Sequence, residues 1–146
     1  MDNLSLRKAV ANDSEFAYTV KRAAFRQYVE RVWGWDDDEQ RQLHKRRFAA
    51  QDFRVINLAG NDIGIMAVVE GPDCVGLNQI FLLPEHQGKG IGGKCMHLIM
   101  DEARRLGLPV RLRVLKVNNR ARAFFQRLGF VPMGETDTHD LMQWTP

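Results

Sequence analysis

The chain has 146 residues with a formal net charge of +3, and 45% of them are hydrophobic and 27% charged, the balance of a soluble globular protein. No run approaches the roughly 18 apolar residues of a membrane span, the first ten residues carry no apolar export signal, and Cys74 and Cys95 match no metal or redox spacing. Nothing in these features suggests a membrane span, export or a cysteine-bound metal, and we expect one domain over residues 1–146 in the reducing cytoplasm.

The N-terminal segment predicts a strand and then a long helix. "LSLRKAV", residues 4–10, alternates apolar and polar side chains, as a half-buried strand does. Asn12 and Glu15 have the spacing of a capping box, which opens a helix that Gly34 ends. The apolar side chains of this helix recur at steps of four residues: Phe16, Val20, Ala24, Tyr28 and Val32. We therefore expect an amphipathic helix over residues 12–33.

A second helix and three strands follow. Asp36 and Glu39 repeat the capping-box spacing, so a helix is expected to run on to about Ala50. Strand-like runs bounded by the turns "GND" and "GPD" predict three strands, at residues 53–59, 62–70 and 74–83.

After Pro84 the pattern becomes helical again. Apolar residues keep helical spacing over residues 91–106, and Gly107 with Pro109 supplies the stop.

The C-terminal part predicts a strand, a short helix and two more strands. Residues 110–117 alternate as a strand, residues 118–129 form the helix, and the last strands lie near 130–134 and 138–144. The inward side chains of the first of these strands are Val110, Leu112 and Val114. The whole order is β-α-α-β-β-β-α-β-α-β-β. Antiparallel meanders around one central β-α-β unit predict an α+β fold with a mixed, mostly antiparallel sheet flanked by helices.

Positive charge is concentrated in residues 84–127, which carry 10 basic and 3 acidic side chains, whereas residues 1–73 carry 11 and 12. Such an excess is typical of a solvated basic face, of a surface that attracts nucleic acid, or of a site for a compact polyanion that bears several phosphates. Charge alone does not choose between them.

Within that segment, "GKGIGGK", residues 88–94, fits three phosphate-binding patterns. It contains the G-x-G-x-x-G of a dinucleotide-binding turn and the G-x-x-x-x-G-K of a P-loop without its Ser/Thr. With Gln87 in front, it also contains the Q-x-x-G-x-G of acyl-coenzyme A binders. Each pattern places backbone N–H groups at a helix N-terminus, where the helix dipole favours a phosphate.

Two of the three patterns lack a partner that their chemistry needs. A dinucleotide fold needs an acidic residue about 20 positions further on, where this chain has Arg113 and Lys116. A P-loop needs a hydroxyl after its lysine, where this chain has Cys95. The acyl-coenzyme A pattern is the one that remains.

That pattern is joined to a second motif. "IFLLPEHQGKGIGGK" is followed, after a helix and a strand, by "VNNRARAFFQRLGF". At this spacing the two motifs resemble those of the GCN5-related N-acetyltransferase (GNAT) family, closely over residues 74–134 and by element order over the whole chain. The resemblance implies acetyl-coenzyme A as cofactor and transfer of its acetyl group, by direct attack, to a primary amine of a small molecule or peptide. It implies neither nucleic acid nor membrane as a partner, and the fold is compatible with a homodimer.

In this family the loop backbone holds the coenzyme A diphosphate, and the preceding strand pairs with the pantetheine arm. The resemblance therefore implies the following cofactor site: Ile80, Phe81, Leu82, Leu83, Gln87, Gly88, Lys89, Gly90, Ile91, Gly92, Gly93, Lys94, Asn118, Arg120, Phe124 and Phe125. A backbone N–H near Ile80 or Phe81 would polarise the acetyl carbonyl as an oxyanion hole does.

One residue departs from the family pattern. Many members have a tyrosine at the position of Phe125, where it protonates the departing thiolate, and the tyrosines here, Tyr18 and Tyr28, are far away in sequence. A thiol pKa near 8.5 makes the thiolate a tolerable leaving group near neutral pH, and acid catalysis contributes about 10²–10⁴-fold. We expect a slower enzyme or an acid elsewhere; the alternative is a catalytically silent acyl-coenzyme A sensor.

Glu70 and His139 are the candidate bases for the amine proton, although each also fits an ordinary exposed strand residue.

The acceptor pocket is expected at the connection between the first two helices, which roofs that pocket in the family. There Trp33, Trp35, Asp36 and Glu39 would suit a cationic, partly apolar amine. Alternatively, the acids cap a helix and the tryptophans belong to the core.

Overall fold

One sheet of seven strands runs through residues 3–146, the part of the chain that the computed structural model describes, in the order β1-β2-β3-β4-β5-β7-β6. The strands are β1 Leu4–Lys8, β2 Asp52–Leu58, β3 Asn61–Glu70, β4 Val75–Leu82, β5 Val110–Leu115, β6 Val131–Glu135 and β7 His139–Trp144. Only the central β4–β5 pair is parallel. The predicted element order and the mixed, mostly antiparallel sheet are confirmed.

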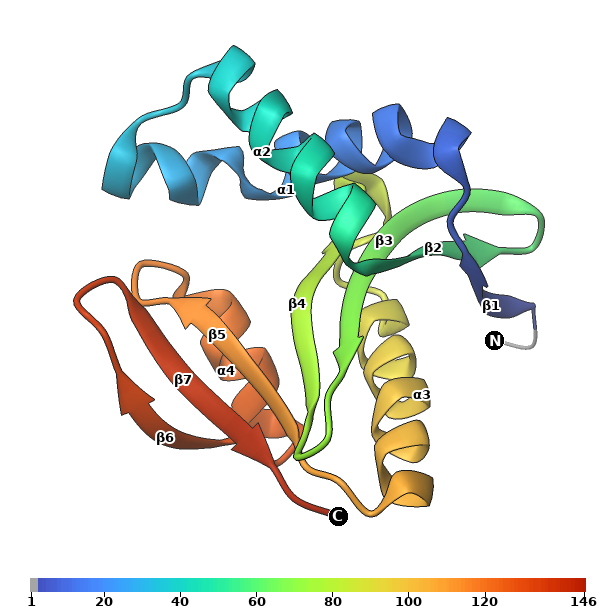
Figure 1. The fold of residues 1–146 in the computed structure, drawn as a ribbon, viewed down its shortest axis with the longest axis vertical. Coiled ribbons are helices and arrows are strands. Elements are labelled where there is room, and N and C mark those ends of the chain that lie inside the picture. The colour runs from blue at the N-terminus through green and yellow to red at the C-terminus, as the bar shows by residue number, and fades with distance from the viewer. Residues whose placement is uncertain (1–2) are drawn as a thin grey trace.

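Helices cover the sheet from two sides (Figure 1). They are α1 Ser14–Trp33, α2 Asp37–Ala50, α3 Ile91–Leu106 and α4 Asn119–Arg127. Apolar residues of α1 and α2 pack with Phe53, Ile65 and Ala67 on one face, whereas α3 and α4 pack on the larger core of the other face. Among the described residues, no helix combines the length and the apolarity needed to cross a bilayer.

The start of α1 differs from the predicted capping box of Asn12 and Glu15. Asp13 is the residue before the helix, and its carboxylate makes no capping bond to α1. It accepts instead from the backbone N–H of Val10 at 2.8 Å and from both terminal nitrogens of Arg7, also at 2.8 Å. The Arg7 guanidinium holds the pKa of Asp13 below its usual range. Asp13 therefore stabilises the connection between β1 and α1 by binding Arg7 and Val10. The prediction was wrong because residues Ala11–Asp13 form a 3₁₀ turn ahead of α1, so Asn12 is not the residue that precedes the helix.

The buried face of α1 also departs from the predicted stripe. Its buried residues are Ala17, Tyr18, Val20, Lys21 and Val29, so only Val20 of the predicted five is fully buried. The capping of α2 agrees better, since the Asp36 carboxylate accepts from the Glu39 N–H at 3.1 Å.

A bulge in β4 separates this strand from β5. Val68 of β3 lies opposite Leu77, and Ala67 lies opposite Gln79, so Asn78 is left out of the register. The β4–β5 pairing covers only residues 75–77 and 110–112. Beyond it the two strands diverge, as Figure 1 shows.

The bulge also decides which way the β4 side chains point. Directly opposed residues of two strands share a face of the sheet. Gln79 therefore shares the α1–α2 face with Ala67, whereas Ile80 shares the α3–α4 face with Met66. Beyond the bulge, the side chains of β4 therefore point alternately to the α1–α2 face and to the α3–α4 face of the sheet.

Candidate active site

A cavity of about 1480 Å³ lies where β4 and β5 diverge. Its walls come from β4, β5 and β7, from the glycine run before α3, from α4, and from α1 and α2. Pockets for a single small ligand usually measure roughly 300–1,000 Å³. This cavity therefore has room for two ligands side by side.

The glycine run forms a cradle of backbone N–H groups at one end of the cavity. Gly88 and Gly90 have φ angles of 73° and 81°, which glycine adopts without strain. The Lys94 N–H bonds back to the Gly90 carbonyl at 3.3 Å, so the N–H groups of residues 91–93 have no partner within the helix. A Cβ on Gly90 or Gly93 would meet nothing within 4 Å. These open, unpaired donors at a helix N-terminus fit a diphosphate.

Two side chains hold this cradle against its neighbours. The Gln87 amide Nε2 donates to the Leu82 carbonyl at 2.9 Å, which fixes the loop to the end of β4. Arg120 of α4 donates to Gln87 Oε1 at 3.4 Å and lies 3.9 Å from the position that a Cβ on Gly88 would occupy. Arg120 therefore brings a positive charge beside the predicted phosphate site.

Some of the other predicted cofactor residues line the cavity and some do not. Along β4, the backbone beyond Asn78 has no paired residue of β5 opposite it, and both Ile80 and Phe81 line the cavity. Asn118 lines it too, but its side chain caps α4 by accepting from the Ala121 N–H at 3.1 Å. Four predicted residues do not line the cavity: Leu83, Lys89, Ile91 and Lys94.

The aromatic pair of α4 reaches the cavity from the core. Phe125 is 6% exposed, its ring packs edge-to-face on Phe124 and Phe130, and both Phe124 and Phe125 line the cavity. Of the two tyrosines in the chain, Tyr28 of α1 lines the cavity and Tyr18 does not. The fold thus brings one phenol to the site from a helix that is distant in sequence.

The two candidate bases lie in different places. Glu70 is exposed at the end of β3, opposite Val75, and does not line the cavity. His139 lines it, at the start of β7. Two groups contact His139 Nδ1: the Thr138 hydroxyl at 2.8 Å and the Arg113 guanidinium at 3.3 Å. Because arginine only donates, Nδ1 is the acceptor and the ring proton is on Nε2. Burial, with the charge of Arg113, lowers the pKa of His139, so the ring is neutral near pH 7.

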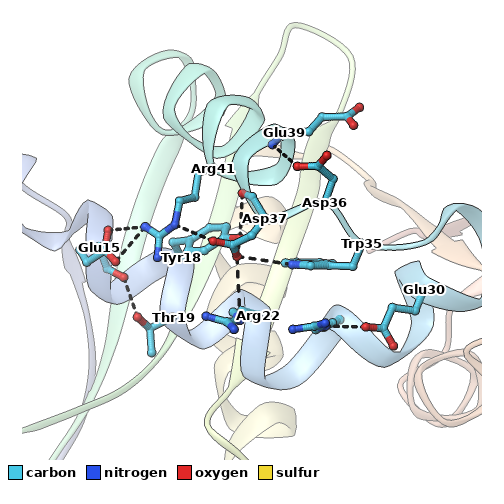
Figure 2. Close-up of polar contacts among 11 residues, drawn as sticks. Glu15, Tyr18, Thr19, Arg22, Glu30, Trp35, Asp36, Asp37, Glu39 and Arg41 are labelled. Carbon is cyan, nitrogen blue, oxygen red and sulfur yellow. Dashed lines mark hydrogen bonds and ion pairs between the residues drawn. The ribbon is translucent and has the colours of Figure 1, made fainter.

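The connection between α1 and α2 is held by a polar network around Asp37 (Figure 2). The Tyr18 hydroxyl donates to Asp37 Oδ1 at 2.6 Å, and Arg41 donates to Oδ2 at 3.0 Å and to Glu15 at 2.9 Å. The bond from Tyr18, with that from Arg41, lowers the pKa of Asp37 to about 2. Burial, with the charge of Asp37, raises the pKa of Tyr18 to about 12. This network fixes α2 on α1.

The predicted acceptor residues are divided between that network and the cavity. The Trp35 indole lies 3.5 Å from Asp37 Oδ1 and stacks near Tyr18, away from the cavity lining. Trp33, Asp36 and Glu39 do line the cavity, and Trp33 is 60% exposed with its ring 6.1 Å from that of His139. These three residues are exposed and line the cavity where α1 and α2 connect.

Five cations that line the cavity escaped the sequence reasoning: Lys21 of α1, Arg47 of α2, Arg111 and Arg113 of β5, and Arg127 of α4. Lys21 is only 2% exposed. Helical spacing carried a signal for it, because Lys21 follows Ala17 by four residues and precedes Ala24 by three, which places a charge inside the apolar stripe. No local pattern marks the four arginines.

Comparison with known proteins places the chain in a family. The family model described as the acetyltransferase (GNAT) family matches residues 15–130. A search of the curated proteins found no significant match.

Solved structures share the fold at low sequence identity. The PaiA N-acetyltransferase of Thermoplasma acidophilum, in complex with coenzyme A, is 16% identical with a TM-score of 0.81, over 98% of this chain and 99% of that one. The ribosomal-protein-S18-alanine N-acetyltransferase of Escherichia coli is 18% identical with a TM-score of 0.74, over 97% and 93%. A mutant form of the spermidine/spermine N-acetyltransferase SpeG of Vibrio cholerae is 22% identical with a TM-score of 0.72, over 99% and 95%.

Proposed function

The chain belongs to the acetyltransferase (GNAT) family, which uses acetyl-coenzyme A, and we propose that it transfers the acetyl group to a primary amine of a small molecule or peptide. The observation that carries this proposal is the glycine cradle at the divergence of β4 and β5, which opens into a cavity shared with α1 and α2. Acetyl-coenzyme A supplies a thioester, whose C–S bond breaks as the amine nitrogen forms its bond to the acetyl carbon.

The chain's own residues position both reactants. The N–H groups of residues 91–93 and the Arg120 guanidinium hold the diphosphate through charge-assisted hydrogen bonds. The β4 backbone near Ile80 and Phe81, unpaired on its β5 side, offers an N–H to the acetyl oxygen. The acceptor enters between α1, α2 and β7, whose residues line the other end of the cavity.

Two proton transfers accompany the reaction. His139 is neutral and lines the cavity, so we assign it to take the proton of the acceptor ammonium; Nδ1 can do so once the Arg113 guanidinium and the Thr138 hydroxyl turn away. The departing thiolate finds no hydroxyl at Phe125, and Tyr28 is the phenol that lines the cavity. We assign protonation of the departing thiolate to Tyr28, directly or through a water.

The acceptor class does not follow from the fold. One of the similar structures is named for acetylating a protein alanine and another for acetylating polyamines. The choice therefore lies with the side chains of the acceptor end.

The test is calorimetric titration of acetyl-coenzyme A, with ATP and NADPH as controls, followed by thiol release with a panel of amines and peptides. The proposal is supported if acetyl-coenzyme A binds, ATP and NADPH do not, and thiol is released only when an amine is present. Binding without turnover by any amine would contradict it and indicate an acyl-coenzyme A sensor.

A further inference from the structure

The acceptor end of the cavity contains a cluster of three cations as well as the acids Asp36 and Glu39. Lys21, Arg47 and Arg113 come from α1, α2 and β5 and line the same cavity. Leu112 and Val114 point into the core under α3 and α4, so Arg113 between them points to the opposite face, where α1 and α2 lie. The three cations therefore approach the cavity from its α1–α2 side.

These cations have no acidic partner among the described residues, unlike several other arginines of this protein. Arg7, Arg41, Arg54 and Arg122 each lie within 3.0 Å of a carboxylate. Within residues 3–146, the side chains of Lys21 and Arg47 make no ion pair or hydrogen bond, and Arg113 contacts the neutral ring of His139.

Asp36 and Glu39 are too far along α2 to neutralise this cluster. Glu39 is eight residues before Arg47, and a helix rises about 1.5 Å per residue, so roughly 12 Å separates their backbones along the axis. Asp36 is further away, and its carboxylate already accepts from the Glu39 N–H at 3.1 Å. The three cations thus remain without counter-charge.

The same cluster is unfavourable for the protein when nothing is bound. Burial, with the charge of Arg47, lowers the pKa of Lys21 to about 8. Burial also lowers the pKa of Arg47, with Arg113 and Arg46 adding to the effect. Of the three cations, Lys21 is buried, Arg47 is half-buried and Arg113 is exposed. An anion placed among cations that repel one another stabilises their charged forms.

This anion is distinct from the cofactor phosphates. Arg120 and the glycine cradle belong to α4 and the start of α3, which pack on the opposite face of the sheet from the one to which Arg113 points. Gln79 shares the α1–α2 face, is 7% exposed, and has no partner for its side-chain Oε1. A buried amide oxygen without a partner fits an amine N–H.

We propose that the acceptor is an amine that also carries an anionic group, a carboxylate or a phosphate, which Lys21, Arg47 and Arg113 bind while Gln79 receives the amine. This inference rests on the proposed acetyl transfer and narrows its acceptor. It departs from the cationic amine that the acids of residues 36–39 suggest in the sequence.

Matched acceptor pairs test this inference by thiol release. Glycine against glycinamide isolates a carboxylate, O-phosphoethanolamine against ethanolamine isolates a phosphate, and spermidine represents a cationic acceptor. We expect the anionic member of at least one pair to have a kcat/KM roughly tenfold higher or more, as a hydrogen-bonded charge contact gives. The pair whose anionic member has the higher kcat/KM shows whether the site binds a carboxylate or a phosphate. A preference for spermidine or for the uncharged members would overturn the proposal.

Single substitutions then connect that preference to the cluster. Arg113→Gln and Arg47→Gln should raise the KM of the anionic acceptor roughly tenfold, bringing the paired acceptors closer together, while the affinity for acetyl-coenzyme A measured by calorimetry stays the same. Arg46→Gln is the matched control, since Arg46 is exposed, adjacent to Arg47 and outside the cavity lining. Equal effects of Arg46→Gln and Arg47→Gln would contradict the assignment.

Binding separates this inference from the proposed function. Glycine and O-phosphoethanolamine are titrated into the protein saturated with coenzyme A. If no amine yields thiol but one of these anions binds and Arg113→Gln removes the binding, acetyl transfer fails and the anion site stands. If uncharged amines are acetylated and neither anion binds, acetyl transfer stands and the anion site is wrong.

Discussion

The cavity has two ends, one proposed for coenzyme A and one proposed for the acceptor, and they differ in which protein groups line them. The coenzyme end consists mainly of backbone, with the glycine run and β4 contributing N–H groups from residues 80–93. The acceptor end consists of side chains from α1, α2, β4, β5 and β7, which are spread over most of the chain. A backbone site depends on conformation, and a side-chain site depends on charge and burial.

That difference teaches where each end is vulnerable. At the coenzyme end a substitution acts by changing φ, almost independently of side-chain chemistry. At the acceptor end it acts by changing charge in a poorly solvated place, with opposite consequences for stability and for binding. The predictions below are ordered by the size of the expected effect.

The largest effect is expected at Gly90, whose φ of 81° a β-branched residue adopts only with strain of about 1–3 kcal/mol. Gly90→Val should therefore lower the affinity for acetyl-coenzyme A roughly 100-fold in calorimetry, because the cradle N–H groups turn away. Gly107→Val is the control: Gly107 has a φ of 68° at the other end of the same helix, outside the cavity lining. Similar affinity losses in both variants would mean that the cradle is not the coenzyme site.

Lys21→Met should stabilise the protein while it weakens the acceptor site. Lowering the pKa of Lys21 from 10.5 to about 8 corresponds to a folding penalty of about 3 kcal/mol at neutral pH, which methionine does not incur. We expect urea unfolding at pH 7 to show a gain of about 2 kcal/mol.

The gain in stability from Lys21→Met should depend on pH. Because the pKa is lowered in the folded state, the penalty is complete below about pH 8 and disappears as the pH rises from there to 10.5. The advantage of Lys21→Met should shrink over that interval. An advantage that is the same at pH 7 and pH 10.5 would show that packing, and not charge, causes it.

Phe125→Tyr should raise kcat about tenfold, since it places a proton donor in the cavity wall of α4. Phe130→Tyr controls for the cost of a buried hydroxyl, because Phe130 belongs to the same aromatic cluster and does not line the cavity. No gain in kcat from Phe125→Tyr would indicate that proton delivery to the thiolate does not limit the reaction.

The smallest effect is expected at Asp37, whose hydrogen bonds fix α2 without contacting the cavity. Its pKa is about 2 in the folded state, so its contribution to stability is present above pH 3.8 and is lost as the pH falls to about 2. Asp37→Asn should lower Tm by a few degrees at pH 7 and make little difference near pH 2. Asp38→Asn, one position further along the same helix turn, should leave Tm unchanged at both values.

Several features remain predictions after the structure is known. They are the single domain over residues 1–146, the cytoplasmic location, the homodimer, and the absence of nucleic acid and membrane partners.

The sequence by itself determined the fold class and the position of the glycine cradle. Helix stops at Gly34 and Gly107, the cap at Asp36 and the glycine run after β4 are local features, because each depends on hydrogen bonds between residues a few positions apart. The order of the elements followed from such signals. Neighbouring residues also make up the cradle, so its spacing is visible in the chain.

Only the tertiary structure decided the acceptor end. The bulge at Asn78 turned Gln79 toward α1, and the packing of α1 and α2 brought Lys21 and Arg47 to the face of Arg113. The same packing brought Trp35 and Asp37 into the contact between the helices. Strand pairing places Glu70 opposite Val75 at the end of β3, outside the cavity lining. Contacts between distant residues depend on sheet register and helix placement, which a run of neighbouring residues does not encode.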